Sequence, residues 1–406
     1  MKEGNIAVAQ SGGPTAAINA SLCGVIKKAA AESRKIYGIL NGIQGALENR
    51  FIDLGKLFRN KDDLYLLKMT PAAYLGSCRY CLPDPGPEQE IYETVFSNLK
   101  KLNITMVAYI GGNDSMDTVM KLSRYAELHK KDISFVGIPK TIDNDLMGTD
   151  HTPGFGSAAK FVATAVSEIA RDCSVYLSRS VTVVEIMGRN AGWLTAASAL
   201  ARSAFCDAPH LIYLPEKNLS VQKIIDDFAG CTARNAVIAV SEGVKNENGV
   251  YLSDLDSNTS HDKFGHAQLC GAARVVESII KTNFGIKTRS VELNVLQRCS
   301  SHFASLTDLN ESECMGIFGT EKLLEGETGV AVGMERVGNY EVIPICNDVS
   351  MVANLEKRVP DDFISANGCD VTEKAIEYLR PLILGEPEII TENGIPKQIP
   401  RPSEKE

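Results

Sequence analysis

The sequence has 406 residues, of which 44% are hydrophobic and 23% are charged, with 33 glycines and 16 prolines. These values are typical of a globular protein and exclude disordered, collagen-like and small disulfide-stabilised classes. Because 42 basic residues stand against 51 acidic ones, the net charge of −9 does not favour binding to nucleic acid or to an anionic membrane. An anionic substrate would need a local cluster of bases.

Short β-branched runs alternate with longer stretches of helical period along the chain, beginning with a strand at 6–9 and a helix at 16–31. Further strands are predicted at 104–110, 134–138, 181–186, 211–214, 236–240, 290–295 and 330–334, and further helices at 117–129, 157–172, 221–231 and 267–281. Most of these strands lack strict alternation, as expected of strands that are buried on both faces. The pattern predicts an α/β fold with parallel sheets.

The ends and the cysteines indicate a cytoplasmic protein. The first residues show no signal-peptide pattern, and no segment reaches 18 apolar residues, so we expect no membrane span. Eleven scattered cysteines suggest reduced thiols. Cys78 and Cys81 have the spacing of half a zinc or redox site, but the next cysteine, Cys173, lies outside zinc-ribbon spacing. The polar tail 391–406 is expected to lie loosely on the surface.

Ligands of open parallel sheets bind beyond the carboxyl ends of the strands, and two glycine-rich loops follow predicted strands here. Residues 10–15 read Gln-Ser-Gly-Gly-Pro-Thr, and residues 111–115 read Gly-Gly-Asn-Asp-Ser. Glycines at the start of a helix let backbone N–H groups approach an anion, so the two loops predict a phosphate bound from two sides. The structural alternatives are a plain tight turn and a helix cap supplied by Asp114 or Ser115.

Three further loops bring charged side chains to strand ends. Residues 139–145, Pro-Lys-Thr-Ile-Asp-Asn-Asp, place one base and two carboxylates within a few residues, which suits a general base and a stabilised phosphoryl group. Arg189 lies between glycines in residues 187–193, and Glu242 ends another strand. Arg289 and Arg298 flank the predicted strand 290–295. A solvated Asx-turn, a surface salt bridge and a turn cap are the alternatives for these groups.

In this order, the motifs resemble those of the phosphofructokinase family, and more closely of its pyrophosphate-dependent branch. The matching segments lie at 11–13, 75–79, 111–115, 139–145, 183–189 and 241–243, and at Arg289 with 297–298, within residues 5 to about 353. The resemblance implies two Rossmann-like three-layer αβα domains with mostly parallel sheets and an active site in the cleft between them. The donor domain would comprise 1–154 and about 297–347, the sugar-phosphate domain 155–296 and about 348–390, and the polar tail 391–406.

The resemblance also implies an activity and residue roles. Diphosphate would phosphorylate the 1-hydroxyl of fructose 6-phosphate reversibly with Mg²⁺, giving fructose 1,6-bisphosphate and phosphate in glycolysis or gluconeogenesis. The catalytic group would be Asp143 as general base with Lys140, Asp114, Thr141 and Arg189. Fructose 6-phosphate would bind to Thr141, Ile142, Asp143, Met187, Gly188, Arg189, Glu242, Arg289 and Arg298, and diphosphate to Gly12, Gly13, Arg79, Gly112 and Lys140. The metal would lie near Asn113 or Asp114.

Two residues indicate the phosphoryl donor, because the ATP-dependent branch of the family has glycine at the positions of Asp114 and Lys140. Asp114 would stand where the α-phosphate of ATP lies, and two like charges about 4 Å apart at an effective dielectric of about 20 repel by roughly 4 kcal/mol. Lys140 would stabilise the transition state when diphosphate is the donor. ATP as donor, or a catalytically silent sugar-phosphate sensor on the same fold, are the alternative functions.

The resemblance further implies a homodimer or homotetramer, in which a neighbouring subunit contributes one of the two arginines that hold the 6-phosphate. The sequence departs from the family pattern at Asn113, where relatives usually have an aspartate near magnesium, and at Val295, where many have a histidine. Cys23 replaces an arginine of the regulatory nucleotide site, so we expect no such allosteric control. Other acceptors, such as sedoheptulose 7-phosphate, stay open.

Overall fold

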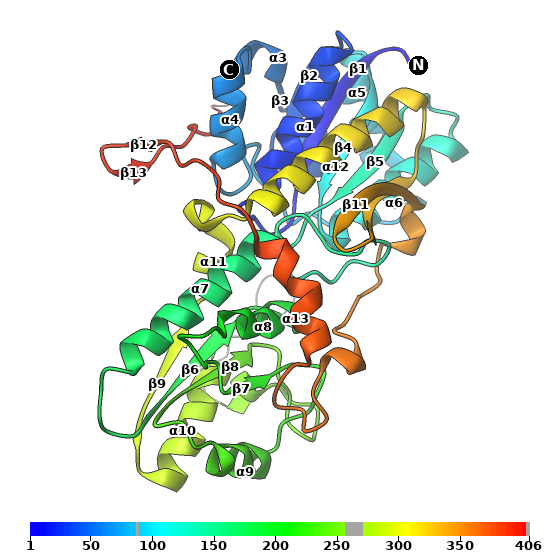
Figure 1. The fold of residues 1–406 in the computed structure, drawn as a ribbon. Coiled ribbons are helices and arrows are strands. Elements are labelled where there is room, and N and C mark those ends of the chain that lie inside the picture. Colours follow the sequence, from blue (N-terminus) through cyan, green and yellow to red (C-terminus); the bar gives the residue numbers. More distant parts are fainter. Residues whose placement is uncertain (87–88, 256–270, 403–406) are drawn as a thin grey trace.

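The computed structural model describes residues 1–86, 89–255 and 271–402, which form two β-sheets covered by helices on both faces (Figure 1). The larger sheet has the order β11-β10-β5-β4-β1-β2-β3 and the smaller one the order β7-β8-β6-β9. The strands of the larger sheet are β1 (Asn5–Gln10), β2 (Ile36–Ile39), β3 (Phe51–Asp53), β4 (Ile104–Gly111), β5 (Ser134–Pro139), β10 (Val330–Val337) and β11 (Glu341–Asp348). Those of the smaller are β6 (Ser180–Ile186), β7 (Leu211–Tyr213), β8 (Asn235–Ser241) and β9 (Lys287–Glu292).

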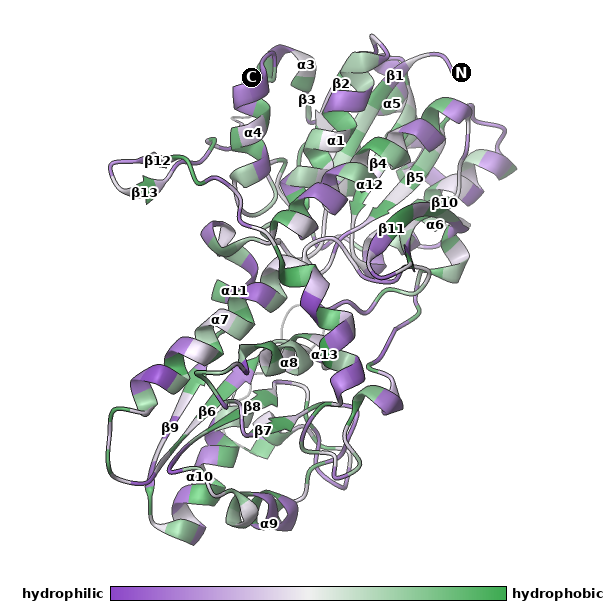
Figure 2. Ribbon diagram, in the orientation of Figure 1, coloured by the Kyte–Doolittle hydropathy of each residue, from purple (hydrophilic) through white to green (hydrophobic). Residues whose placement is uncertain are grey.

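Both sheets are mostly parallel. Only the pairs β2–β3 and β10–β11, at the two edges of the larger sheet, run antiparallel among the described strand pairs of these sheets. The central strands are apolar in both sheets (Figure 2), as strands covered on two sides must be. This confirms the predicted α/β fold, and it brings the carboxyl ends of β1, β4 and β5 to one edge of the larger sheet.

Helices form the outer layers. Around the larger sheet lie α1 (Ile18–Ala31), α2 (Gly42–Leu47), α3 (Leu54–Leu57), α4 (Lys61–Met69), α5 (Gln89–Lys101), α6 (Asn113–Leu128) and α12 (Leu306–Glu325). Around the smaller lie α7 (Phe155–Cys173), α8 (Trp193–Ala197), α9 (Val221–Gly230), α10 (Ala272–Phe284), α11 (Leu296–Cys299) and α13 (Glu373–Leu379). Apolar residues of α1 and α12 pack on one face of the larger sheet, and those of α5 and α6 on the other.

Small residues allow α1 and α12 to pack closely side by side. A Cβ on Gly24 of α1 would come within 2.1 Å of the Glu313 carbonyl oxygen, and a Cβ on Gly316 of α12 within 2.0 Å of the Ser21 carbonyl oxygen. Both positions therefore require glycine for the two helix backbones to touch. This contact attaches α12, which lies late in the chain, to the sheet that the first residues begin.

Several predicted elements differ from the structure. The strand expected at 290–295 is wrong by three residues, because β9 is Lys287–Glu292. The helix expected at 267–281 is found as α10, and residues 267–270 lie outside the described part of the chain. The tail forms a short hairpin of β12 (Thr391–Glu392) and β13 (Ile395–Pro396), after which the Ile399 N–H donates to Thr70 Oγ1 at 3.0 Å. The described tail is thus attached to the larger lobe, which is the larger sheet with the helices around it; the smaller sheet and its helices form the smaller lobe.

The chain passes between the two lobes more than once, as the predicted domains require. Strands β10 and β11 add to the larger sheet after β9 has completed the smaller one. Val349, Val352 and Ala353 still pack in the core of the larger lobe, and farther along the chain Phe363 and Leu379 join the core of the smaller lobe. We propose the domain boundaries given above, except that the return to the smaller lobe lies after residue 353 rather than at about 348.

Candidate active site

Loops from both sheets line one pocket of about 140 Å³. Most of its residues follow the ends of β1, β4 and β5 in the larger sheet and of β6 and β8 in the smaller one, and Arg298 comes from α11. They are Gly13, Pro14, Gly112, Lys140, Thr141, Ile142, Asp143, Met187, Glu242 and Arg298. Nine of these ten residues were predicted from the sequence, and the pocket lies where the carboxyl ends of the strands in the two sheets face each other.

The two glycine-rich loops are held together beneath the pocket. Ser11 and Ser115 share a hydrogen bond of 2.5 Å between their hydroxyl oxygens, and the Ser77 hydroxyl donates to the Gly12 carbonyl oxygen at 2.6 Å. Gly111 must be glycine, because a Cβ there would lie 1.9 Å from the Ser115 hydroxyl oxygen. The backbone of both loops therefore faces the same space, as expected for binding one phosphate group from two sides.

Lys140 brings positive charge to this space from the end of β5. Its side chain is buried, and its ammonium group donates to the Gly13 carbonyl oxygen. The ammonium also lies 3.3 Å from where a Cβ on Gly12 would be. Burial lowers the pKa of Lys140 to about 8, although the carboxylates of Asp143 and Asp145 oppose this shift. A bound anion would restore the charge partner that the buried ammonium needs.

Asp143 occupies the middle of the pocket wall. Its backbone N–H donates to Thr141 Oγ1 at 3.1 Å, and the same hydroxyl lies 3.4 Å from a carboxylate oxygen of Asp143. Burial raises the pKa of Asp143, whereas Lys140, the Thr141 hydroxyl, Arg189 and Arg298 act in the opposite direction. The carboxylate is consequently more basic than an exposed aspartate, which suits a group that accepts a proton.

The opposite wall comes from the smaller sheet. The Gly188 N–H donates to a carboxylate oxygen of Glu242 at 3.3 Å, and the Met187 N–H donates to the side-chain oxygen of Gln297 at the same distance. Gly243 has no room for a side chain, because a Cβ would lie 1.8 Å from the Arg189 carbonyl oxygen. Burial, and then the charge of Asp143, raise the pKa of Glu242 to about 8.

The remaining predicted residues divide into two groups. Gly12, Gly188 and Arg189 adjoin the pocket. Gly12 lies next to the Lys140 ammonium, the Gly188 N–H donates to Glu242, and the positive charge of Arg189 lowers the pKa of Asp143. Arg79, Asp114 and Arg289 are not among the described residues that line it. Arg298 lines the pocket close to Gly13, so its guanidinium lies on the side of the phosphate loops.

Arg289 points to a different place. It lies within β9 and pairs with Thr182, which is four residues before the end of β6. Arg289 is therefore not at the strand end that faces the pocket. One guanidinium nitrogen lies 3.4 Å from a carboxylate oxygen of Asp172. Within one chain, the structure therefore brings Arg298 but not Arg289 to the pocket.

Asn113 and Asp114, the residues predicted to lie near the metal, differ in their surroundings. The Asn113 side-chain oxygen accepts from the Asn354 N–H, and its amide group donates to the Leu355 carbonyl oxygen at 2.8 Å. Asp114 is exposed on the first turn of α6. The described part of the chain has no cluster of three or more His, Cys, Asp or Glu side chains placed for a metal ion, at Cys78 and Cys81 or elsewhere. Mg²⁺ often binds through one or two carboxylates and substrate phosphates, and the exposed Asp114 fits that mode better than the engaged Asn113.

Sequence reasoning missed several polar groups that surround the site. Lys357 and Glu216 are half-buried behind the loops, and Asn190 and Asn144 make side-chain contacts there. Asn144 and Asn190 lie in segments that the sequence singled out, at 139–145 and 187–193, but neither was named as a functional residue, and Glu216 and Lys357 lie in no such segment. Their partners are mostly backbone groups from distant parts of the chain, so no local spacing could have indicated them.

Known proteins resemble this chain over nearly its whole length. The family model described as "Phosphofructokinase" matches residues 5–294. Two relatives named "Pyrophosphate--fructose 6-phosphate 1-phosphotransferase", from Xanthomonas campestris and Halomonas elongata, are 37% and 38% identical, and each match covers 98% of this chain and 96% of the relative.

A solved structure of a pyrophosphate-dependent phosphofructokinase from Nitrosospira multiformis has a TM-score of 0.87 at 36% identity, covering 97% of this chain and 95% of that one. Among the described residues, no helix combines the length and the apolar character needed to cross a membrane. The family model, the relatives and the solved structure all name the same family, and the chain belongs to the phosphofructokinase family.

Proposed function

We propose that this protein transfers a phosphoryl group reversibly between diphosphate and the 1-hydroxyl of fructose 6-phosphate. The observation that carries the proposal is the single pocket in which the buried ammonium of Lys140 and the carboxylate of Asp143 face a wall from the other sheet. The names of the relatives give the same donor and acceptor. We further propose that the protein acts in the cytoplasm, in keeping with its family.

In the proposed reaction, fructose 6-phosphate lies against Met187, Gly188 and Glu242, and its 1-hydroxyl faces Asp143. Asp143 accepts the hydroxyl proton while the hydroxyl oxygen attacks the terminal phosphorus of diphosphate. The bond to the bridging oxygen breaks, and phosphate leaves. The reverse reaction returns the proton from Asp143 to the sugar oxygen.

The developing negative charge meets groups that are already in place. Lys140, the Thr141 hydroxyl and the N–H groups of the glycine-rich loops face the diphosphate, and Arg189 and Arg298 add positive charge beside Asp143. Gly12, Gly13, Gly112 and Arg79 complete the proposed diphosphate site, with Ile142 at the acceptor. Mg²⁺, held mainly by diphosphate oxygens with Asp114, would neutralise charge on the leaving phosphate.

The donor preference rests on Asp114 and Lys140. ATP-dependent 6-phosphofructokinases are also among the relatives, for example one from Actinobacillus pleuropneumoniae at 30% identity. With magnesium and fructose 6-phosphate, the purified protein is expected to use diphosphate and to show little activity with ATP. The measurement is the rate of fructose 1,6-bisphosphate formation with each donor alone. Activity with ATP alone would contradict the donor assignment, and no product with either donor would contradict the proposed reaction.

We propose that Arg289 completes the acceptor site of a neighbouring subunit. Within its own chain it lies away from the pocket, beside exposed apolar residues at the end of α7: Val175, Tyr176 and Leu177. The ammonium group of Lys287, also on β9, lies 5.1 Å from the centre of the Tyr176 ring. An apolar patch next to an arginine is typical of a subunit interface.

Mixing two inactive variants tests this assignment. Asp143→Asn and Arg289→Met subunits, each inactive alone, are expected to regain about a quarter of the wild-type activity when dissociated and reassembled together, because mixed dimers contain one intact site. The measurement is the specific activity of the mixture, with the oligomeric state from light scattering. If Arg289 serves its own chain, or if the protein is a monomer, the mixture will stay inactive.

A further inference from the structure

The segment that returns the chain from the larger sheet to the smaller lobe contacts three of the loops that form the proposed site: the start of α6, residues 139–145 and residues 187–193. We call residues 354–357 (Asn-Leu-Glu-Lys) the bridging segment. Its first two residues, Asn354 and Leu355, are attached to the start of α6, on the side of the proposed diphosphate site. The Asn354 N–H donates to Asn113, which donates in turn to the Leu355 carbonyl oxygen at 2.8 Å, and the Asn354 side chain donates to Asp117 at 3.0 Å. These contacts fix the first turn of α6, which carries Asp114.

The other end of the bridging segment holds the loop that carries Asp143. The Lys357 N–H donates to the Asp145 carbonyl oxygen at 2.7 Å. The Lys357 ammonium lies 3.3 Å from the side-chain oxygen of Asn144, 3.1 Å from the Thr149 carbonyl oxygen and 2.6 Å from that of Asp150. Asn144 and Asp145, the two residues that follow Asp143, are therefore both bonded to one half-buried lysine.

Asn144 needs such support, because its backbone has a positive φ of 53°. Few residues other than glycine adopt this conformation, and asparagine is one that does. Its side-chain oxygen also accepts from the Thr152 N–H at 3.1 Å, and its amide donates to the Tyr378 hydroxyl at 3.2 Å. The backbone conformation next to Asp143, and with it the orientation of the Asp143 side chain, thus depends on contacts that include Lys357.

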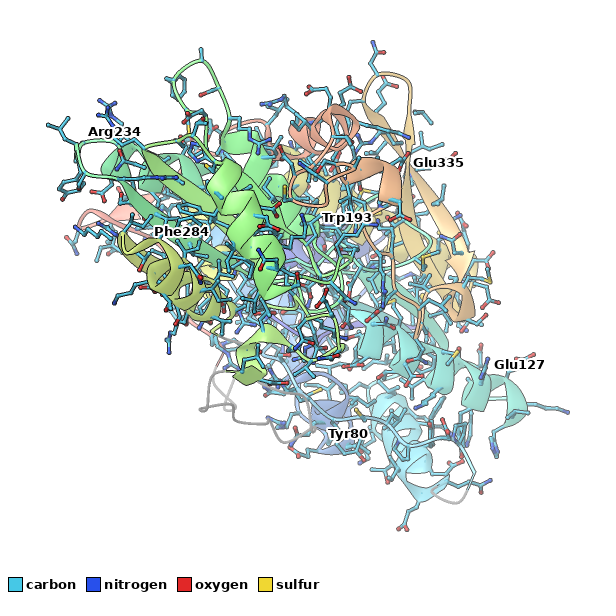
Figure 3. All side chains as sticks on the ribbon, turned by 90° about the horizontal axis from the view of Figure 1, so that it is seen from below. Tyr80, Glu127, Trp193, Arg234, Phe284 and Glu335 are labelled. Atoms are coloured by element: carbon cyan, nitrogen blue, oxygen red, sulfur yellow. The ribbon has the colours of Figure 1, made fainter. Side chains whose placement is uncertain are left out.

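The bridging segment also contacts the acceptor side. The Asn190 side chain donates to Glu356, and the indole N–H of Trp193 donates to the Lys357 carbonyl oxygen at 2.9 Å. Asn190 follows Arg189 directly, and Trp193 lies three residues later in the same loop. Trp193, labelled near the centre of Figure 3, is buried. The acceptor loop is therefore attached to the same four residues as the other two loops.

We propose that the bridging segment sets the distance between diphosphate and the sugar hydroxyl. Its residue Lys357, and Asn113 of α6, which binds the other end of the segment, are positioning residues. The proposal rests on the proposed function for the identity of the two substrates. In-line transfer requires the reacting atoms to lie about 3 Å apart, and a misplacement of about 1 Å costs a factor of about 100 in rate. Neither residue lines the pocket, so both act through the loops that they hold.

Lys357→Met removes the ammonium and keeps the length of the side chain. It is expected to lower kcat about 100-fold in both directions of the reaction, with the Kd of each substrate alone changed less than about threefold. Lys160→Met is the matched control, because Lys160 is another lysine that donates to backbone carbonyl oxygens, those of Ala304 and Gly385, is more deeply buried than Lys357, and contacts none of the three loops. The control should keep kcat within about threefold of the wild type.

Asn113→Ala provides a second variant, since alanine is well tolerated in the first turn of α6. It is expected to lower kcat about tenfold, and the double variant with Lys357→Met should deviate from the product of the two single effects, because both residues hold one segment. Additive effects, a kcat for Lys357→Met no lower than that of Lys160→Met, or a matching rise in the Kd of both substrates would overturn the proposal.

Amide hydrogen exchange of the substrate-free protein separates this proposal from the proposed function. Exchange at residues 140–153 and 187–193 should be faster in Lys357→Met than in the wild type, and unchanged in Lys160→Met. If the wild type shows no transfer, the proposed function fails while faster exchange still supports the positioning role. If the wild type transfers and exchange in Lys357→Met is unchanged, the positioning role fails and the proposed function stands.

Discussion

Replacing Asp143 with asparagine is expected to lower kcat by a factor of ~10²–10⁴, the range found when a general base is removed. Asparagine has nearly the same shape but cannot accept the hydroxyl proton at the moment of attack. Steady-state rates with saturating diphosphate and fructose 6-phosphate measure the loss. The Kd for fructose 6-phosphate should change little, and this unchanged binding is the control for correct folding.

The pH profile provides a second test of Asp143. A base must be ionised to act, so kcat should rise as pH increases through the pKa of Asp143, which burial has raised above its usual value. The acidic limb of the profile should be absent in Asp143→Asn. A variant that retains more than a tenth of the wild-type kcat, with the acidic limb intact, would show that another group accepts the proton.

Replacing Lys140 with methionine is expected to lower kcat with diphosphate by ~10²–10³, as found when one preorganised donor to a developing oxyanion is removed. The pKa of about 8 means that the ammonium is charged below that pH and loses its proton above it. Wild-type activity should therefore fall as pH rises beyond about 8, and the bound diphosphate will move this limb upward. In Lys140→Met the alkaline limb should disappear.

The assignment of diphosphate as the phosphoryl donor predicts a further result for Asp114 and Lys140 together. Asp114→Gly combined with Lys140→Gly should weaken the use of diphosphate, because the charge beside the bridging oxygen is lost. Rates with diphosphate and with ATP, measured side by side, give the ratio of kcat/KM for the two donors. Full diphosphate activity in this double variant would refute the roles of both residues.

The sequence allowed the pocket to be predicted because its residues follow apolar strands in short segments. Asp143 and Lys140 lie three residues apart, and parallel topology then brings Met187 and Glu242 from the other sheet to the same place. The role of Asn113 was less predictable. Its side chain bonds to backbone groups more than 200 residues later, a contact that depends on tertiary structure alone.

Helix α12 and the start of β9 were not predicted, because the hydrophobic pattern of these segments does not match the way in which they pack. Helix α12 buries Ser312, Gly316 and Thr320 against its neighbours, and such small polar residues do not look like the apolar face of a helix. In β9 the charged residues Lys287 and Arg289 hide the start of the strand, which is an edge strand whose residues are largely half-buried. The bridging segment has no motif, because backbone groups make several of its contacts.

The late position of segments that complete both cores determines when the protein can fold during its synthesis. The larger sheet needs Val330–Val337, and the core of the smaller lobe includes Val359 and Leu382. Domains usually fold one after another as they leave the ribosome. Here neither lobe is complete until most of the chain has emerged, so folding is expected to follow translation, and the apolar strands β1 and β4 are surfaces for chaperones until then.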